Sequence, residues 1–302
     1  MFQPVRTLPG RSLRAATLDD WAVPRVTQGD WPSGGPAGTQ ADLEQADLEA
    51  VRKLATEMTA LALTDAGLRQ AAGHSRTGVI IASTAPDLGD LVSSQLGFAA
   101  SRPYPAAAQT SSLHAVTAAA AALQAGELDL AIAGGAELGL DPVWLTLQAR
   151  AGTLGTDEMR VYAADPAGLL PGEGCGVVIL IRSADARAAG VPAYAEIAGW
   201  NAVPAGPPEL AGPALEQAYQ RAGADPAGIQ YIEGQGTGTA AGDSAELAAF
   251  SGLRRDMRVT AALGAASAGI GYVRAAADIA SLIRTAAAMA AGTMPPGPGC
   301  AR

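Results

Sequence analysis

Short apolar runs alternate with amphipathic stretches along most of the chain. Residues 77–83 form an apolar run bounded by turn residues, which is the pattern of a buried parallel strand. Strands alternating with helices imply right-handed crossovers and a sheet covered on both faces, so the fold class is α/β. Similar runs predict further strands at residues 128–133, 176–181, 194–198, 229–232 and 258–263.

Helical periodicity fills the intervals between these runs. Apolar side chains recur at helical spacing over residues 42–68, where Gly67 is placed to end the helix. The stretches at 111–124 and 273–290 are rich in alanine, whose small side chain lets a helix be buried between two sheets. High helix propensity or a GC-rich genome would give the same composition. The pattern favours a layered sandwich with central helices, and it predicts further helices at residues 210–222 and 244–253.

The first part of the chain differs from the rest. Residues 1–40 contain Pro, Gly and Trp without a sustained period, which predicts an irregular N-terminal arm. Residues 1–14 mix Pro, Gly and Arg without an apolar core, so they do not resemble a signal peptide. The longest apolar runs are interrupted, so no membrane span is predicted and we expect a cytoplasmic protein.

Composition narrows the function classes. A chain of 302 residues with 49% hydrophobic content can bury a sizeable core. The net charge of −9 argues against a nucleic-acid partner, because phosphate binding requires clustered Lys and Arg. The two cysteines, Cys175 and Cys300, are too few for a disulfide framework and have no partner at metal-ligand spacing. We therefore expect neither a metal site nor a cofactor.

Four motif regions occur in a fixed order. Residues 107–113 read Ala-Ala-Gln-Thr-Ser-Ser-Leu. Two glycine-rich segments follow, Ala-Ile-Ala-Gly-Gly-Ala at 131–136 and Gly-Glu-Gly-Cys-Gly-Val-Val at 172–178. Next comes Glu-Gly-Gln-Gly-Thr-Gly-Thr at 233–239, with Gly-Asp and Glu-Leu shortly after it. The last region, 264–277, runs from a glycine-rich turn into an alanine-rich helix.

Together these motifs resemble the β-ketoacyl synthases of the thiolase superfamily. The resemblance implies an αβαβα sandwich with buried central helices. It places a ketosynthase-like domain at 41–302, with two pseudo-repeated halves at roughly 41–185 and 186–302. Relative to the family, the chain starts inside the N-terminal half and ends before the closing strand. We therefore expect a domain truncated at both ends.

The catalytic positions of the family hold other residues here. The resemblance puts Gln109 where the family has its nucleophilic cysteine, which a helix N-terminus normally activates. Gln235 and Tyr272 stand at the positions of the two histidines, and Ser267 at that of a lysine. An amide and a phenol donate hydrogen bonds, but neither carries the positive charge available to histidine. These positions are therefore degenerate, and no catalytic residue is predicted.

The remaining candidate residues have ordinary interpretations. Neither His74 nor His114 falls on a catalytic position, and each is interpreted as a solvated or hydrogen-bonded histidine. The pair Arg254 and Arg255 would suit an acidic carrier protein, although we favour the interpretation of a solvated basic turn.

Within the family, glutamine in place of the nucleophile occurs in two groups. One is the chain-length factor, a silent subunit that pairs with an active ketosynthase in type II polyketide synthesis. The other is a loading decarboxylase, which retains both histidines. Because both histidines are missing here, we favour a chain-length factor of the short polyene or highly reducing type. Its partners would be a catalytic ketosynthase subunit in a heterodimer and an acyl carrier protein. A pseudo-ketosynthase scaffold is a further alternative.

Overall fold

The computed structural model describes residues 40–68, 76–85, 87–98, 111–138, 142–155, 157–202, 211–254 and 260–295, with side chains of the first helix described from residue 48. The predicted N-terminal arm, except for its last residue, lies outside these ranges, as do Cys300 and Arg255.

The first sheet has the strand order β1-β2-β3. Strand β1 (Thr77–Ala82) pairs in parallel with β2 (Leu130–Glu137), as the apolar runs predict. Strand β3 (Gly174–Ile181) pairs antiparallel with β2, and this corrects the expectation of a parallel strand. Gly174 lies opposite Glu137, so the chain returns to the sheet at the end where β2 left it. An antiparallel return of this kind needs no crossover helix.

The second sheet consists of β4 (Tyr231–Glu233) and β5 (Ala262–Gly264), which are parallel. The strand predicted at 194–198 is wrong, because the structure assigns no strand there. Side-chain contacts hold this segment elsewhere: the Tyr194 hydroxyl donates to Asp65 at the end of the first helix, and Glu196 pairs with Arg187. Apolar character predicted a buried strand, but Ile197 is 39% exposed.

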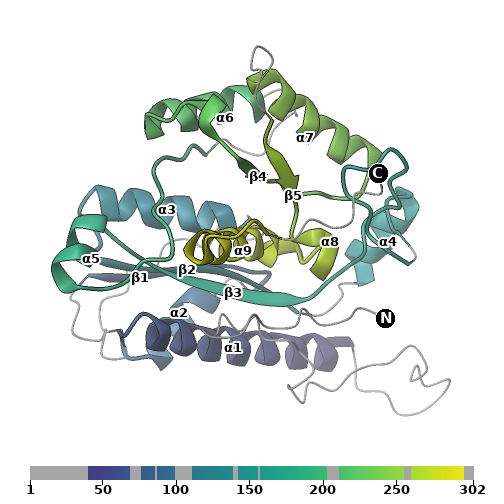
Figure 1. Ribbon diagram of the computed structural model, residues 1–302. Coiled ribbons are helices and arrows are strands. Elements are labelled where there is room, and N and C mark those ends of the chain that lie inside the picture. The colour runs from purple at the N-terminus through teal and green to yellow at the C-terminus, as the bar shows by residue number, and fades with distance from the viewer. Residues whose placement is uncertain are drawn as a thin grey trace.

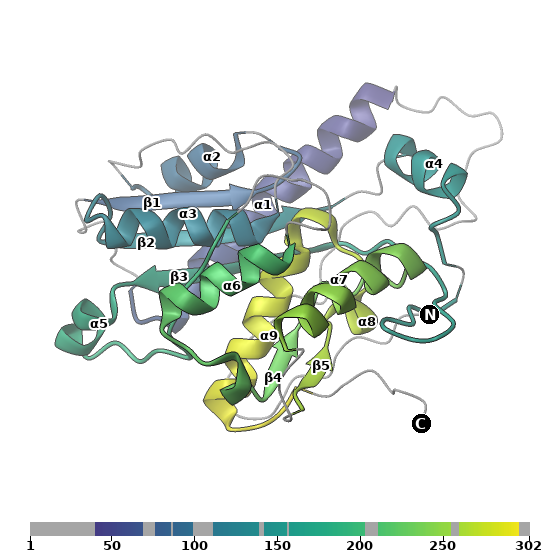
Figure 2. The ribbon, with the colours of Figure 1, turned by 90° about the horizontal axis from the view of Figure 1, so that it is seen from above.

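The elements stack in layers (Figure 1). Helices α1 (Gln40–Asp65) and α2 (Leu88–Gln95) cover one face of the first sheet, while α3 (Ser112–Gln124) and α9 (Ala277–Ala291) cover the other. The second sheet lies beyond α9, and α6 (Ala211–Ala222) and α7 (Ala240–Leu253) lie side by side outside it, as Figures 1 and 2 show. The predicted αβαβα sandwich is confirmed. Shorter elements are α4 (Pro142–Arg150), α5 (Ser183–Ala189), α8 (Ser267–Ile270) and the 3₁₀ turns η4 (Pro226–Gly228) and η5 (Arg274–Ala276).

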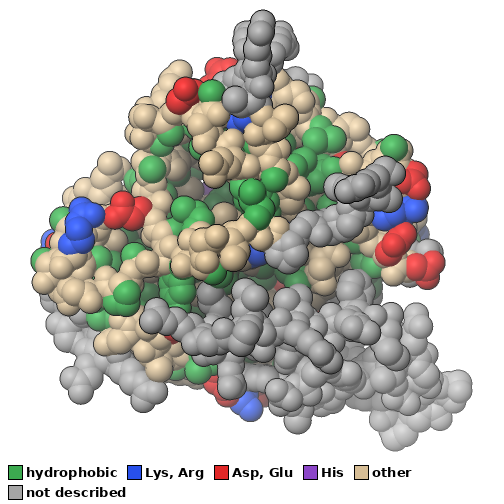
Figure 3. All heavy atoms as spheres, in the orientation of Figure 1, with side chains coloured by type: hydrophobic (Ala, Val, Ile, Leu, Met, Phe, Trp, Pro, Cys, Tyr) green, Lys and Arg blue, Asp and Glu red, His purple; other side chains and the backbone are tan. Residues whose placement is uncertain are grey.

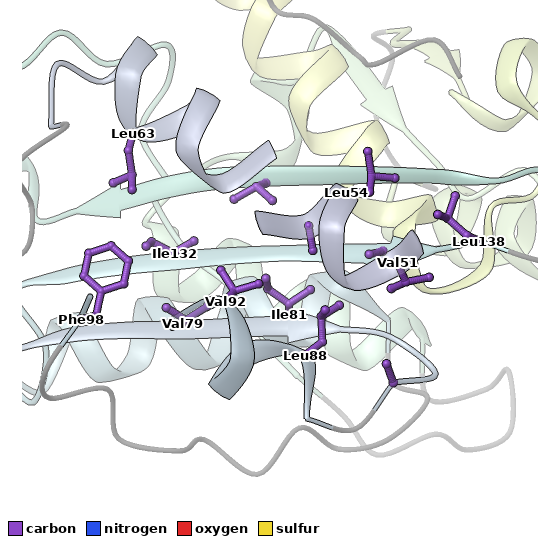
Figure 4. Packing of buried hydrophobic residues seen from close by; sticks show 14 of the residues in the cluster. Val51, Leu54, Leu63, Val79, Ile81, Leu88, Val92, Phe98, Ile132 and Leu138 are labelled. Atoms are coloured by element: carbon purple, nitrogen blue, oxygen red, sulfur yellow. The ribbon is translucent and has the colours of Figure 1, made fainter. Parts of the chain in front are cut away.

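Two hydrophobic clusters fill the spaces on either side of the first sheet. Between the sheet and helices α1 and α2, aliphatic side chains such as Leu54, Leu88 and Ile132 are fully buried (Figure 4). On the other side, Ala119 and Ala122 of α3 pack against the sheet, as expected of a central alanine-rich helix. In α9 only Ile279 and Ala288 are buried, so one side of this helix remains accessible.

Candidate functional site

The loop at 234–239, which carries Gln235, connects β4 to helix α7. Two carboxylates from the first turns of α7 hold its backbone. The amide of Gln235 donates to Oε1 of Glu246 over 2.7 Å, and the amide of Gly238 donates to Oδ1 of Asp243 over 3.0 Å. Gly236 and Gly238 have φ values of +57° and +70°, which non-glycine residues rarely adopt. The glycine spacing of the motif therefore sets the loop shape.

Tyr162 packs against this loop from the segment before β3. Its hydroxyl donates to Oε2 of Glu246 over 2.6 Å, and its amide donates to Oδ2 of Asp243 over 2.7 Å. Burial of the phenol, reinforced by the negative charge of Glu246, raises the pKa of Tyr162 well above its usual value. Tyr162 therefore stays a neutral donor and links two distant parts of the chain. The sequence analysis did not single it out.

Ser267 lies beside Gln235, as the aligned motifs predict. Its hydroxyl donates to the carbonyl oxygens of Gly236 (2.6 Å) and Gln235 (3.0 Å), and the residue is 5% exposed. The hydroxyl proton is thus engaged by the backbone, which makes Ser267 a structural tie rather than a nucleophile.

Gln235 and Ser267 line a shallow depression next to the start of α9. No part of the depression encloses a water-sized cavity. Its charged member is Asp278, in the first turn of α9, and the sequence analysis missed it. An acidic residue early in a helix is a capping signal as much as a functional one, so the motif alone gave no reason to select it. The other lining residues are Ile270, Gly271, Ala277 and Ser281.

Tyr272 follows this group in sequence but does not line the depression. Its ring stacks on Trp144 of α4, with ring centres 6.3 Å apart and planes inclined by 16°. Burial raises the pKa of the Tyr272 phenol, the charge of Asp278 raises it further, and Arg274 opposes both. The structure therefore brings Gln235 and Ser267 together, while the ring of Tyr272 lies against Trp144 and its phenol stays within electrostatic reach of Asp278.

The predicted position of the nucleophile, Gln109, lies outside the described residues, as does His74. The next described residue is Ser111, whose hydroxyl caps α3 by accepting from the amide of Leu113 over 3.2 Å. The next residue, Ser112, is fully buried and accepts from the amide of Ile279 over 2.8 Å, which ties α3 to α9. His114 lies one turn further along α3 and is partly buried.

The described lining offers an amide, hydroxyls and one carboxylate. Neither a thiol nor an imidazole is among these groups, so the described part of the depression contains no activated nucleophile of the cysteine–histidine kind. Over the described ranges, no group of side chains is arranged to hold a metal ion. None of the helices described is both long and apolar enough to cross a membrane.

Known families match both halves of the chain. Residues 88–186 match the N-terminal domain of β-ketoacyl synthases, and residues 194–300 match the C-terminal domain. The two domains follow each other in the order that the motifs predict. The chain belongs to the β-ketoacyl synthase family.

The curated relatives of this ketosynthase-like chain are polyketide synthases. A stretch of 197 residues, 62% of the chain, is 37% identical to highly reducing polyketide synthase sorA of Penicillium rubens. Another of 202 residues is 38% identical to the spectinabilin polyketide synthase system protein NorA′ of Streptomyces orinoci. These stretches span 8% and 6% of the respective proteins.

Solved structures share the fold. The oxazolomycin ketosynthase domain OzmH KS7 of Streptomyces albus JA3453 superposes with a TM-score of 0.69 at 26% identity, over 79% of this chain and 49% of that domain. The ishigamide ketosynthase/chain length factor superposes with a TM-score of 0.73 at 23% identity, over 82% of this chain and 70% of that one. The chain thus spans about half the length of the ketosynthase domain.

Proposed function

We propose that this chain is a non-catalytic chain-length factor of type II polyketide synthesis, of the short polyene or highly reducing type. It pairs with an active ketosynthase, and its side chains close the far end of the partner's acyl tunnel. The observation that carries the proposal is the set of groups beside the α9 helix start: Gln235 and Ser267 line the depression there, at positions where the resemblance puts a histidine and a lysine, and the ring of Tyr272 stacks on Trp144.

Electrostatics support the silent role. Decarboxylative condensation develops negative charge on an enolate and on a thioester oxygen, which ketosynthases stabilise with positioned donors. Here Asp278 places a carboxylate in the same depression as Gln235. A fixed negative charge raises the energy of a nearby developing anion. The depression is therefore unsuited to the charge that the family's reaction creates.

The loading decarboxylase remains the competing enzyme class. That reaction needs no thiol nucleophile, so Gln109 at the predicted position of the nucleophile fits it. It does need enolate stabilisation, and each lost donor of an oxyanion hole typically costs about 2.7 to 4 kcal/mol of activation free energy. The side chain of Tyr272 stacks on Trp144, and a phenol carries no positive charge that would stabilise an enolate as an imidazolium does.

The surface suits a permanent partner. On the face shown in Figure 3, apolar and uncharged groups occupy the centre over α9, and the charged side chains lie mainly toward the edges. Met289 near the end of α9 is 62% exposed. Exposed apolar surface of this kind marks interaction sites, and permanent complexes bury about 2,000 to 5,000 Å². A heterodimer would cover such a surface.

A carrier-protein contact at the basic pair also remains a proposal. Arg254, at the end of α7, donates to the carbonyl oxygen of Pro226 and so helps fix η4 against α7. This contact gives Arg254 a role within the fold, and Arg255 lies outside the described residues.

The partner role is tested by co-expression with an active ketosynthase of the same biosynthetic system. The complex is purified through a tag on this chain alone and assayed for elongation with malonyl-carrier protein. We expect a one-to-one complex that elongates only when both chains are present, with Gln109→Ala and Gln235→Ala largely retaining elongation. Failure to co-purify, or elongation by the partner alone with unchanged product length, contradicts the proposal.

A further inference from the structure

A stack of side chains holds the segment around position 272. The ring of Tyr272 lies against Trp144, and the guanidinium carbon of Arg274 is 5.2 Å from the centre of the Trp144 ring. The Nη1 atom of Arg274 is 3.3 Å from Oε1 of Glu137, at the end of β2. We call these residues the Trp144 stack (Glu137, Trp144, Tyr272, Arg274). They connect α4, β2 and the turn before α9.

Burial makes the ionic part of the Trp144 stack hard to rearrange. The Glu137 side chain is 3% exposed and that of Arg274 is 19% exposed. A charge buried to this degree is costly unless it keeps its partner. The planar guanidinium can pair with the carboxylate and lie over an indole ring at the same time, which a lysine ammonium cannot do equally well.

The backbone of this segment is fixed as well. Arg274 has a φ of +44°, an unfavourable region for a residue with a Cβ atom. Conformations of this kind persist only where the surroundings determine them. The amide of Tyr272 donates to the carbonyl oxygen of Leu170 over 2.7 Å, and the carbonyl oxygen of Tyr272 accepts from the amide of Gly172 over 3.0 Å. The side chain at position 272 is therefore oriented by contacts on both backbone and ring.

We propose that the Trp144 stack is a conformational lock that holds the side chain at position 272 against Trp144, so that it does not turn toward Gln235. The lock rests on the proposed function and deepens it, because it supplies a second reason why the site would not catalyse condensation. The first reason is that the imidazole is missing at position 272. The second is that the stack fixes the direction in which the side chain at this position points. A histidine introduced by Tyr272→His would be held against Trp144 in the same way.

Amide hydrogen exchange, read by mass spectrometry on the intact chain, tests the lock. The reporter is a peptide covering residues 270–276, and a peptide covering β1 monitors overall stability. Trp144→Leu and Glu137→Gln are each expected to speed exchange of the reporter by about fivefold, since the first removes the cation–π contact of Arg274 and the second reduces its ion pair to a hydrogen bond with a neutral amide. Arg274→Lys keeps the charge but not the planar contact, and should do the same. Leu147→Ala, one turn along α4 at a 57% exposed residue, is the matched control and should change nothing.

The double variant Glu137→Gln/Trp144→Leu distinguishes a lock from separate contacts. If the residues act as one unit, exchange stays near the fivefold of the single variants, whereas independent contacts would multiply to about 25-fold. Unchanged exchange in the single variants, or multiplication in the double variant, overturns the lock. Because the measurement needs neither partner nor substrate, its failure leaves the partner-subunit proposal untouched, and the co-expression result leaves the lock untouched.

Discussion

Glu246 is the residue on which the Gln235 loop most depends. Its carboxylate accepts from the amides of Gln235 and Gly236 and from the hydroxyl of Tyr162, over distances of 2.7, 3.1 and 2.6 Å. Hydrogen bonds to a charged group contribute more than neutral ones. The loop shape is therefore maintained by a carboxylate that binds the backbone amides, whichever side chain stands at position 235.

Replacing this carboxylate should loosen the loop. We predict that Glu246→Gln lowers the free energy of unfolding by about 1.5 to 3 kcal/mol, since an amide offers one acceptor oxygen and no charge. Urea denaturation followed by circular dichroism measures the change. Glu216→Gln, at an exposed position on α6, is the control and should stay within about 0.5 kcal/mol. Equal effects of the two substitutions would contradict the role given to Glu246.

Cys175 on β3 makes stability sensitive to alkaline pH. Burial of its thiol raises the pKa to about 12 from an ordinary value of 9.0. Because the pKa is higher in the folded state, its contribution is complete below pH 9 and is lost as the pH rises toward 12. For each pH unit above 9, the free energy of unfolding of the wild-type protein should fall by about 1.4 kcal/mol more than that of Cys175→Ala. Denaturant unfolding at about pH 8 and about pH 10.5 checks this, and equal losses in both proteins would refute it.

At the level of single residues, the sequence motifs pointed to some residues of the depression and not to others. Gln235 and Ser267 lie next to each other, as expected of two positions that the resemblance assigns to one site, and their degenerate roles stay a prediction. Trp144 and Asp278 were not foreseen. Their positions depend on how α4 and α9 pack against segments distant in the sequence, and such contacts leave no periodic signal.

Close packing joins the first sheet to the turn before α9. A Cβ atom at Gly135 of β2 would lie 2.3 Å from the carbonyl oxygen of Ala275. Glycine at this position is therefore a packing requirement and not a conformational one. The contact explains why the Gly-Gly pair in β2 belongs to the same set of motifs as the α9 region.

Gly135→Ala should force β2 and η5 apart. We predict a loss of about 1 to 3 kcal/mol of unfolding free energy, the usual cost of overpacking a rigid core. Gly252→Ala on α7 is the control, because a Cβ there meets nothing within 4 Å, and it should be neutral or slightly stabilising. Thermal unfolding of the two variants compares them directly. A stable Gly135→Ala variant would show that the layers can separate at little cost.

Periodicity predicted most elements but not how they pair. Helices α1, α3, α6 and α7 lie where their apolar spacing places them, and the end of α1 coincides with Gly67 at a φ of +72°. The direction of β3 escaped prediction, since an apolar run looks the same in either orientation. The failed strand at 194–198 shows that apolar side chains do not suffice where polar contacts anchor the segment elsewhere.

For the molecule as a whole, the layered order is the most secure prediction. Alanine-rich sequence identified α3 as a helix that sheets can enclose, and the resemblance implied the αβαβα order. The division into halves at 41–185 and 186–302 stays a prediction, as does the irregular arm. Assembly could not be read from the pattern, because an exposed apolar face does not specify the chain that covers it.

We infer that the chain by itself catalyses no reaction. The most direct test is release of carbon dioxide from malonyl-carrier protein by this chain alone, at enzyme concentrations high enough to detect a single turnover. We predict no release above the rate for carrier protein alone, and none with Asp278→Asn. Catalytic release by the wild-type chain that disappears with Gln109→Ala or Gln235→Ala would contradict the account and identify a decarboxylase.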